Sequence, residues 1–172
     1  MVHTKTHACI RRLFGVFVIV LNSLNIALCN VESDALLVQL AALTDPHKVL
    51  ASWINSFPDP CHWFHVHCDE SGHVIIVDLS FEDMSGHIVH ELGQLTHLRR
   101  LYLNNNRLTG GIPESLTTIS TLTQLDLSNN NLCGLVPSEG SFEKFGPKSF
   151  AGNLQLCGPT VDRQCGWDCD FY

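Results

Sequence analysis

Apolar residues recur at a constant spacing of 24 positions from residue 74 onward. Three successive copies align, and their apolar columns are Val74, Leu98 and Leu122; Val77, Leu101 and Leu125; Leu79, Leu103 and Leu127; Met84, Leu108 and Leu132; and Ile88, Ile112 and Val136. A glycine column of Gly86, Gly110 and Gly134 lies between the last two. Self-similarity at such a period indicates stacked structural repeats rather than one irregular core.

Each copy begins with the pattern Leu-x-x-Leu-x-Leu, which predicts a short strand. Successive side chains of a strand point to opposite faces, so the apolar residues face inward and the residues between them face outward. A single copy cannot bury its apolar edge, and about three copies must stack to form a stable core. We therefore predict an α/β leucine-rich repeat solenoid of three 24-residue repeats, with a parallel concave sheet, a helical N-terminal cap and caps closed by disulfides.

An asparagine column follows the predicted strand in the second and third copies. Asn106 and Asn130 stand where a buried amide can satisfy the backbone groups of a turn. Glu82 takes this position in the first copy. We expect the amide ladder to be broken there and the Glu82 carboxylate to point to solvent.

The first 29 residues have the order of charged and apolar residues typical of a secretory signal. A basic segment ending at Arg12 precedes the apolar stretch 13–28, and the small residues Ala27 and Cys29 precede the predicted cleavage point. Retention as a membrane anchor is the alternative. Polar residues inside the stretch leave it short of the roughly 18 to 20 apolar residues that a span needs, so we predict cleavage and secretion.

The chain is expected to divide into a few segments around the repeats. These are the signal peptide 1–29, an N-terminal cap 30–73, the repeats 74–137, and a C-terminal cap and tail 138–172. Residues 33–43 predict an amphipathic helix, and residues 49–54 a second short helix over the first strand. The core side of the first helix is expected to contain Leu36, Leu40 and Leu43, with Leu37 beside them.

Cysteines and histidines crowd one segment of the predicted N-terminal cap, Cys61-His62-Trp63-Phe64-His65-Val66-His67-Cys68. Both residue types bind zinc and copper, so a metal site is one interpretation. The other is a disulfide that closes a small loop at the end of the solenoid, worth about 2.5 kcal/mol by loop entropy. Because a secretory signal leads to an oxidising compartment, we favour the Cys61–Cys68 disulfide.

The cysteines near the C-terminus are expected to close the other cap. Cys157 and Cys165 form a second small loop in this interpretation. Cys133 is expected on the turn after the third strand, close to that cap. A bridge between Cys133 and Cys169 is one pairing, and free or intermolecular thiols are the alternatives.

Charge and motif content exclude several classes of function. The chain carries 10 basic and 17 acidic side chains. Removing residues 1–29, which hold three of the basic ones, leaves 7 − 17 = −10, which argues against a nucleic-acid binder that neutralises phosphates. His87, His90 and Glu91 lack the order of a metalloprotease motif, and no nucleophile elbow or glycine-rich phosphate loop occurs. We predict no enzyme, no metal and no cofactor.

Motifs in both caps resemble those of known plant proteins. The N-terminal cap carries Asp45-Pro46, Val49-Leu50-x-Ser52-Trp53 and Pro60-Cys61-x-Trp63-Phe64-His65-Val66-x-Cys68, and the C-terminal cap carries Gly140-Ser141-Phe142 and Ser149-Phe150-Ala151-x-Asn153-Leu154-x-Leu156-Cys157-Gly158-Pro159. Residues 32–165 resemble the extracellular domain of plant somatic embryogenesis receptor kinases and the small secreted leucine-rich repeat proteins related to them. This chain shows fewer repeats than those relatives and ends at Tyr172 before any hinge, membrane helix or kinase.

The resemblance implies a role in protein recognition. In the receptor kinases the Trp-Phe-His loop of the N-terminal cap reaches into a hormone- or peptide-loaded receptor, so the match assigns that role to Phe64 and His65. Three strands form a concave sheet of about 240 Å², whereas a standard interface needs about 800 Å² per partner, so binding is expected to recruit the caps. The outward sheet residues that we expect to bind are Asp78, Phe81, Arg100, Tyr102, Asn104, Gln124, Asp126 and Ser128.

The leading hypothesis is a secreted protein–protein interaction module in plant receptor-kinase signalling or defence, acting as a co-receptor-like binder or a decoy without a kinase. Its expected partner is a plant receptor-kinase ectodomain or the peptide- or steroid-loaded complex of one, and no nucleic acid. We expect it in the apoplast, with the outer face of the plasma membrane as an alternative. The alternative functions are an extracellular inhibitor of a cell-wall-degrading enzyme and a truncated, non-functional paralogue.

Overall fold

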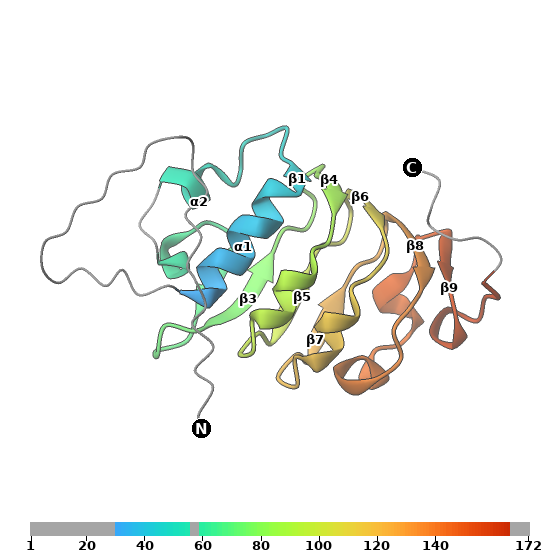
Figure 1. Cartoon of the computed structure of the whole chain (residues 1–172). Coiled ribbons are helices and arrows are strands. Elements are labelled where there is room, and N and C mark those ends of the chain that lie inside the picture. Colours follow the sequence, from blue (N-terminus) through green and yellow to red (C-terminus); the bar gives the residue numbers. More distant parts are fainter. Residues whose placement is uncertain (1–29, 56–58, 166–172) are drawn as a thin grey trace, which may run out of the picture.

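Coils of the chain stack side by side into a solenoid (Figure 1). The computed structural model describes residues 30–55 and 59–165. The stack runs from the helices α1 (Val31–Ala41) and α2 (Ala51–Asn55) at the N-terminal end to the strand β9 (Gln155–Cys157) at the other. No helix of these two ranges is long and apolar enough to cross a bilayer.

The concave sheet has the strand order β2-β3-β5-β7. Its strands are β2 (Val66–Cys68), β3 (Val74–Asp78), β5 (Arg100–Tyr102) and β7 (Gln124–Asp126). The last three are parallel, with Val77, Leu101 and Leu125 in register, which confirms the parallel sheet. The strand β2 pairs antiparallel with β3, so the N-terminal cap adds a strand that the repeat pattern did not predict.

A second sheet, which the sequence pattern did not predict, runs along another side of the solenoid (Figure 1). Its strands, in spatial order, are β1 (Leu43–Thr44), β4 (Ser85–His87), β6 (Arg107–Gly110), β8 (Asn131–Leu135) and β9. The glycine column belongs to it: a Cβ on Gly86, at φ 114°, would lie 2.0 Å from the Ala42 carbonyl oxygen. Cys133 lies within β8, so its expected place on a turn was wrong.

Short 3-10 helices connect the strands and close the remaining side. They are η1 (Pro60–His62), η2 (His90–Gln94), η3 (Glu114–Thr118), η4 (Gly140–Lys144), η5 (Pro147–Phe150) and η6 (Pro159–Val161). The apolar columns point into the space between these helices and the two sheets. They form one continuous buried cluster that extends into both ends of the stack, as repeats that cannot bury their faces alone require.

The asparagine column forms the expected hydrogen-bonded ladder. The Oδ1 atoms of Asn106 and Asn130 accept hydrogen bonds from the Met84 and Leu108 N–H groups of the preceding coils at 2.9 and 3.0 Å. Asn153 adds a further rung by accepting from Leu132 N–H at 3.0 Å. Glu82 supplies no rung among the residues that the structure describes. Its carboxylate is partly buried 3.8 Å from the His65 imidazole, so the expectation that it points to solvent was wrong.

The helix α1 is held to the first coil by polar side chains rather than only by leucines. The buried Gln39 donates from Nε2 to the His87 carbonyl at 2.8 Å and accepts from the Val89 N–H at 3.0 Å. The buried Glu32 accepts from the Val74 N–H at 3.0 Å. These bonds satisfy backbone groups at the open end of the stack, where no earlier coil can pair with them. Leu36 is buried and Leu37 is exposed, and the helix ends at Ala41, so the prediction that Leu43 belongs to it was wrong: Leu43 lies in β1.

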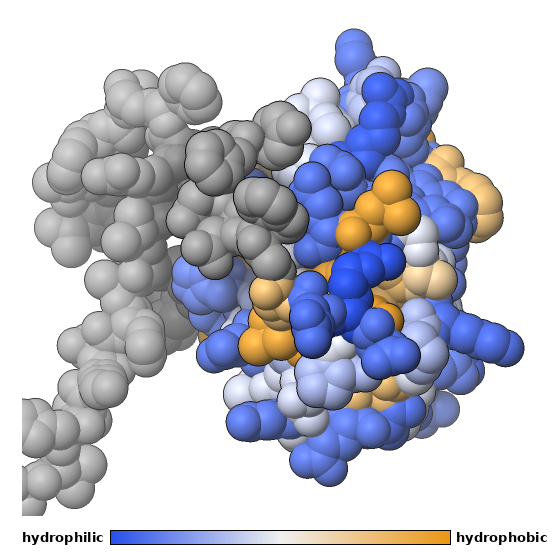
Figure 2. Space-filling model, turned by 90° about the vertical axis from the view of Figure 1, so that its right-hand side faces the viewer, coloured by the Kyte–Doolittle hydropathy of each residue, from blue (hydrophilic) through white to orange (hydrophobic). Residues whose placement is uncertain are grey.

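Aromatic residues and a polar clamp close the C-terminal end. The rings of Phe142 and Phe145 pack edge to face with centroids 5.7 Å apart, and Phe150 is buried beside them. Arg163 Nη1 donates to the carbonyls of Asn153 and Leu156 at 3.3 and 3.1 Å. Figure 2, which faces this end, shows apolar residues scattered among hydrophilic ones.

Candidate functional site

A tight turn in the N-terminal cap presents Phe64 to solvent. Its side chain is 71% exposed. The Phe64 N–H donates to Ser52 Oγ at 3.0 Å, and the Phe64 carbonyl accepts from Trp53 Nε1 at 2.8 Å. The next residue, His65, has the left-handed φ of 70°, and its carbonyl accepts from the Asp78 N–H at 3.0 Å. The backbone of the turn is therefore fixed on both sides while the ring stays free.

The turn rests on a buried aromatic pair and is closed by a disulfide. Trp53 and Trp63 are buried, and their rings stack with centroids 5.4 Å apart. The structure contains the expected Cys61–Cys68 disulfide, so both sulfurs are bonded to each other rather than available as thiolate ligands. Preorganisation of this kind lowers the entropy lost when an exposed side chain is buried against a partner.

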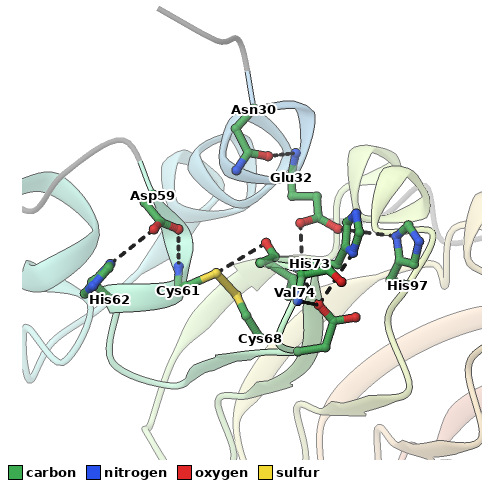
Figure 3. Close-up of a disulfide and its surroundings, with 12 residues drawn as sticks. Asn30, Glu32, Asp59, Cys61, His62, Cys68, His73, Val74 and His97 are labelled. Carbon is green, nitrogen blue, oxygen red and sulfur yellow. Dashed lines mark hydrogen bonds and ion pairs between the residues drawn. A yellow bond between two sulfur atoms is a disulfide. The ribbon is translucent and has the colours of Figure 1, made fainter.

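The surroundings of the disulfide contain paired histidines (Figure 3). His62 lies with its Nδ1 3.3 Å from an Asp59 carboxylate oxygen. The rings of His73 and His97 stack with centroids 3.8 Å apart. Backbone hydrogen bonds from His73, and less so from Ser71, lower the pKa of the Asp69 carboxyl against the opposing effect of its desolvation. The stacking of His73 on His97 connects the cap to the following coil.

A second exposed phenylalanine is joined to the turn through an imidazole–carboxylate contact. Phe81 is 73% exposed and has the left-handed φ of 63°, which is uncommon for a bulky residue. Its N–H donates to the Asn104 carbonyl at 3.1 Å. Glu82, the next residue, lies 3.8 Å from His65. Each residue of the partly buried His65–Glu82 pair thus follows an exposed phenylalanine in the chain, and strained backbone of this sort clusters at functional sites.

The strand register sets the remaining candidate residues in two rows across the sheet. Arg100 pairs with Gln124 in one row, and Tyr102 pairs with Asp78 and Asp126 in the other. The Tyr102 hydroxyl donates to Gln124 Oε1, which links the rows. The predicted residues that the fold brings to this side of the molecule are Phe64, His65, Asp78, Phe81, Arg100, Tyr102, Gln124 and Asp126.

Two predicted binding residues are not available on the surface. Asn104 and Ser128 are each only 9% exposed, so their expected outward position was wrong. They lie past the ends of β5 and β7, where the chain already turns and the alternation of a strand no longer holds. Glu82 was not among the binding residues predicted from the sequence. Its position in the asparagine column predicted only an interruption of the ladder.

An exposed ion pair that begins one residue after Glu82 connects the first two coils. The Arg107 guanidinium donates to both carboxylate oxygens of Asp83. This hydrogen bonding and the positive charge of Arg107 lower the pKa of the Asp83 carboxyl, against the opposing effect of desolvation. His47 lies 3.9 Å from the same carboxylate. Asp83 is therefore held in place as a structural carboxylate.

Comparison with known proteins agrees with this architecture. A model of the leucine rich repeat N-terminal domain matches residues 29–69, and a leucine rich repeat model matches residues 97–119 and 121–142. Leucine-rich repeat protein 1 of Arabidopsis thaliana is 47% identical over 74 residues, which are 43% of this chain and 34% of that protein. This chain is a plant leucine-rich repeat protein. The matched segment spans about a third of the length of that relative.

Solved structures of plant receptors share the fold of this leucine-rich repeat protein. The PEPR1–AtPEP1 structure superposes with a TM-score of 0.59 at 32% identity, covering 62% of this chain and 16% of that chain. The ectodomain of the Arabidopsis receptor kinase HAESA, in complex with an IDA peptide hormone, gives a TM-score of 0.55 at 34% identity, covering 62% of this chain and 18% of that chain. The α/β leucine-rich repeat solenoid is thereby confirmed.

Proposed function

We propose that this protein is a secreted protein–protein interaction module of plant receptor signalling or defence, and that it acts as a co-receptor-like binder or as a decoy. One observation carries the proposal: the rigid cap turn and the first coil each expose a phenylalanine, Phe64 and Phe81, next in the chain to His65 and Glu82, which lie 3.8 Å apart. Exposed aromatic side chains on a fixed backbone are typical of the residues that contribute most to protein interfaces.

The size of the sheet supports binding through the cap as well. With β2 included, the four strands of three to five residues give a surface of about 220 Å², well below the roughly 800 Å² per partner of a standard interface. The remaining interface area has to come from the turn that holds Phe64 and from the exposed Phe81 beyond the end of β3. The docking surface that we propose consists of Phe64, His65, Asp78, Phe81, Glu82, Arg100, Tyr102, Gln124 and Asp126.

The partner that we propose is a plant receptor-kinase ectodomain, alone or loaded with a peptide or steroid. Support comes from the fold shared with HAESA, which is itself a receptor kinase in complex with a peptide hormone. An apoplastic location fits the disulfides Cys61–Cys68 and Cys157–Cys165, because such bonds persist in oxidising compartments.

The division of the chain remains part of the proposal. We propose a signal peptide 1–29, an N-terminal cap 30–73, three 24-residue repeats over 74–137 and a C-terminal cap from residue 138. Cys133 is disulfide-bonded, and we propose Cys169 as its partner, which lies outside the described residues.

Binding to purified receptor ectodomains tests the function. The secreted protein is immobilised and exposed to a panel of plant receptor-kinase ectodomains, with and without their peptides, and the Kd is measured. We expect Phe64→Ala and Phe81→Ala each to weaken binding at least about tenfold, since central aromatic residues commonly contribute more than 1.4 kcal/mol. Leu154→Ala is the matched control, because Leu154 is 80% exposed at the opposite end of the stack.

The possible results separate the proposed function from its alternatives. Equal binding by all variants would remove Phe64 and Phe81 from the docking surface. Binding to a cell-wall-degrading enzyme and to no receptor ectodomain would favour the inhibitor.

A further inference from the structure

Three consecutive asparagines, Asn129, Asn130 and Asn131, have different environments in the third coil. Asn129 donates from Nδ2 to Asn105 Oδ1 at 3.1 Å, so its amide belongs to a side-chain pair between coils. Asn130 is buried and accepts from the Leu108 N–H at 3.0 Å while its Nδ2 donates to carbonyls. Both amides are committed to the fold.

Asn131 is exposed at the first position of β8, in the second sheet. Within the part of the chain that the structure describes, its side chain forms no hydrogen bond. Its neighbour across the sheet is Thr109 on β6, and that hydroxyl donates to the Gly86 carbonyl at 3.1 Å rather than to Asn131. Of the three amides, only that of Asn131 is free and accessible.

The residue two positions after Asn131 is Cys133. N-linked glycans are transferred to asparagine in Asn-x-Ser/Thr, where the third residue supplies a hydroxyl. A cysteine thiol can replace that hydroxyl as a weaker hydrogen-bonding group. In the folded protein Cys133 is buried and disulfide-bonded, so its sulfur carries no proton. Any transfer to Asn131 must therefore precede the disulfide.

We infer that Asn131 is a site of N-linked glycosylation, modified before Cys133 forms its disulfide. Asn131 Nδ2 attacks C1 of the first sugar of a lipid-pyrophosphate-linked oligosaccharide. The new N–C1 bond replaces the C1–O bond to the pyrophosphate, the lipid pyrophosphate leaves with the electron pair of that bond, and it takes up the proton that the amide loses. The inference rests on the proposed secretion, because the lipid-linked donor is met only on that route.

Timing limits how completely the site is modified. If Cys169 is the partner of Cys133, the thiol stays unpaired until 36 more residues, 169 − 133, have been added. At 5–20 residues per second this takes about 2–7 s. Asn131-Leu132-Cys133 is a weak acceptor sequence, and it can be glycosylated only during the seconds before Cys133 forms its disulfide. We therefore expect only a fraction of the chains to carry a glycan at Asn131.

The position of the glycan is compatible with the proposed docking surface. Asn131 lies in the sheet β1-β4-β6-β8-β9, whereas the docking residues lie on β2-β3-β5-β7 and on the cap turn. The two sheets run along different sides of the solenoid (Figure 1). A glycan at Asn131 would cover the start of β8 and leave the concave sheet open to a partner.

Four forms of the full chain, expressed through the secretory pathway of a plant host, test the inference. They are the wild type, Asn131→Gln, Cys133→Ala and Cys133→Thr. The measurement is the mass of each denatured chain before and after an amidase that releases N-linked glycans, so it does not depend on correct folding. We expect a partly glycosylated wild type, no glycan on Asn131→Gln or Cys133→Ala, and several-fold higher occupancy on Cys133→Thr.

The Cys133→Thr form separates the inference from the function on which it rests. If that form is glycosylated and the wild type is not, the inference is overturned while secretion stands. If no form is glycosylated, including Cys133→Thr, the chain does not reach the compartment of the lipid-linked donor. Glycosylation of Asn131 and secretion of the protein are then both overturned. A glycan that persists on Asn131→Gln also overturns the assignment to Asn131.

Discussion

The first coil and the later coils carry different residues at two equivalent positions of the same turn. At the first position, Phe81, Asn105 and Asn129 share a left-handed backbone, with φ of 63°, 57° and 54°. Asparagine tolerates this conformation, and phenylalanine does so at a cost. At the second position, Asn106 and Asn130 build the ladder while Glu82 contacts His65.

This difference separates residues that stabilise the stack from residues that are available to a partner. The later coils have asparagine at both positions, which suits the left-handed backbone at the first and the backbone hydrogen bonds at the second. The first coil has the exposed Phe81 and the partly buried Glu82 there instead. Departures from local preference are expected at functional sites, because the rest of the structure supports them.

Removing a ladder asparagine should have the largest effect on stability. Asn130→Ala leaves the buried Leu108 N–H without its acceptor and removes one of the two amide donors to each of the carbonyls of Leu103 and Leu127, which keep those of Asn106 and Asn153. We expect a loss of about 2–4 kcal/mol in the free energy of unfolding, measured by urea denaturation.

Two neighbouring substitutions calibrate that result. Asn131→Ala, next in the chain and exposed, should change stability by less than about 0.5 kcal/mol. Glu82→Ala, at the equivalent position of the first coil, should cost no more than about 1 kcal/mol, because among the described residues its carboxylate accepts no backbone hydrogen bond and only lies 3.8 Å from the His65 imidazole. Equal losses of unfolding free energy for Glu82→Ala and Asn130→Ala would contradict the idea that Asn130 stabilises the stack whereas Glu82 does not.

Removing either of the two small disulfides should destabilise the protein by a similar amount, but only one of the removals should also weaken binding. Cys61 and Cys68 are 7 positions apart, and Cys157 and Cys165 are 8 apart, so the two loops constrain the unfolded chain almost equally. Replacing either pair by alanine should lower the free energy of unfolding by about 2.5 kcal/mol.

Only the first replacement should also weaken binding to the partner, because it releases the turn that holds Phe64 and His65. The C-terminal pair therefore serves as a control with nearly equal loop size. The measurements are urea denaturation and the Kd under conditions where both variants are folded. Loss of binding in both variants would show that the docking surface extends to the C-terminal cap.

The periodic part of the fold could be predicted from the sequence, and the irregular contacts could not. The 24-residue columns encode which residues are buried, and that was enough for the parallel sheet and the Asn106–Asn130 ladder. The second sheet escaped prediction because its strands have two to five residues and no apolar alternation. The contact between His65 and Glu82 joins the cap to a coil, and no repeat spacing encodes such a pair.

Exchanging Phe81 of the first coil for the asparagine found at the same turn position of the later coils should change stability and binding in opposite directions. Phe81→Asn places the residue of the later coils on a left-handed backbone and should raise the free energy of unfolding by about 1 kcal/mol, the lower end of such strain. The same change should weaken partner binding at least about tenfold.

The reverse exchange is the control. Asn105→Phe adds a bulky side chain at φ 57° and removes the acceptor of the Asn129 amide, so it should destabilise the protein. Thermal and urea denaturation measure both effects. A Phe81→Asn variant that is less stable than the wild type would mean that Phe81 is retained for packing rather than for binding.

The smallest expected effect concerns acid stability of the contact between the first two coils. Because Arg107 lowers the pKa of Asp83, this carboxylate contributes stability that is present above its unfolded pKa, near 3.8, and is lost as the pH falls through the folded value. Arg107→Gln should therefore move the midpoint of acid unfolding slightly to higher pH. Asp83→Asn removes the titrating group, and adding Arg107→Gln to it should produce no further shift in that midpoint. A full additional shift in the double variant would mean that Arg107 acts on a carboxylate other than Asp83.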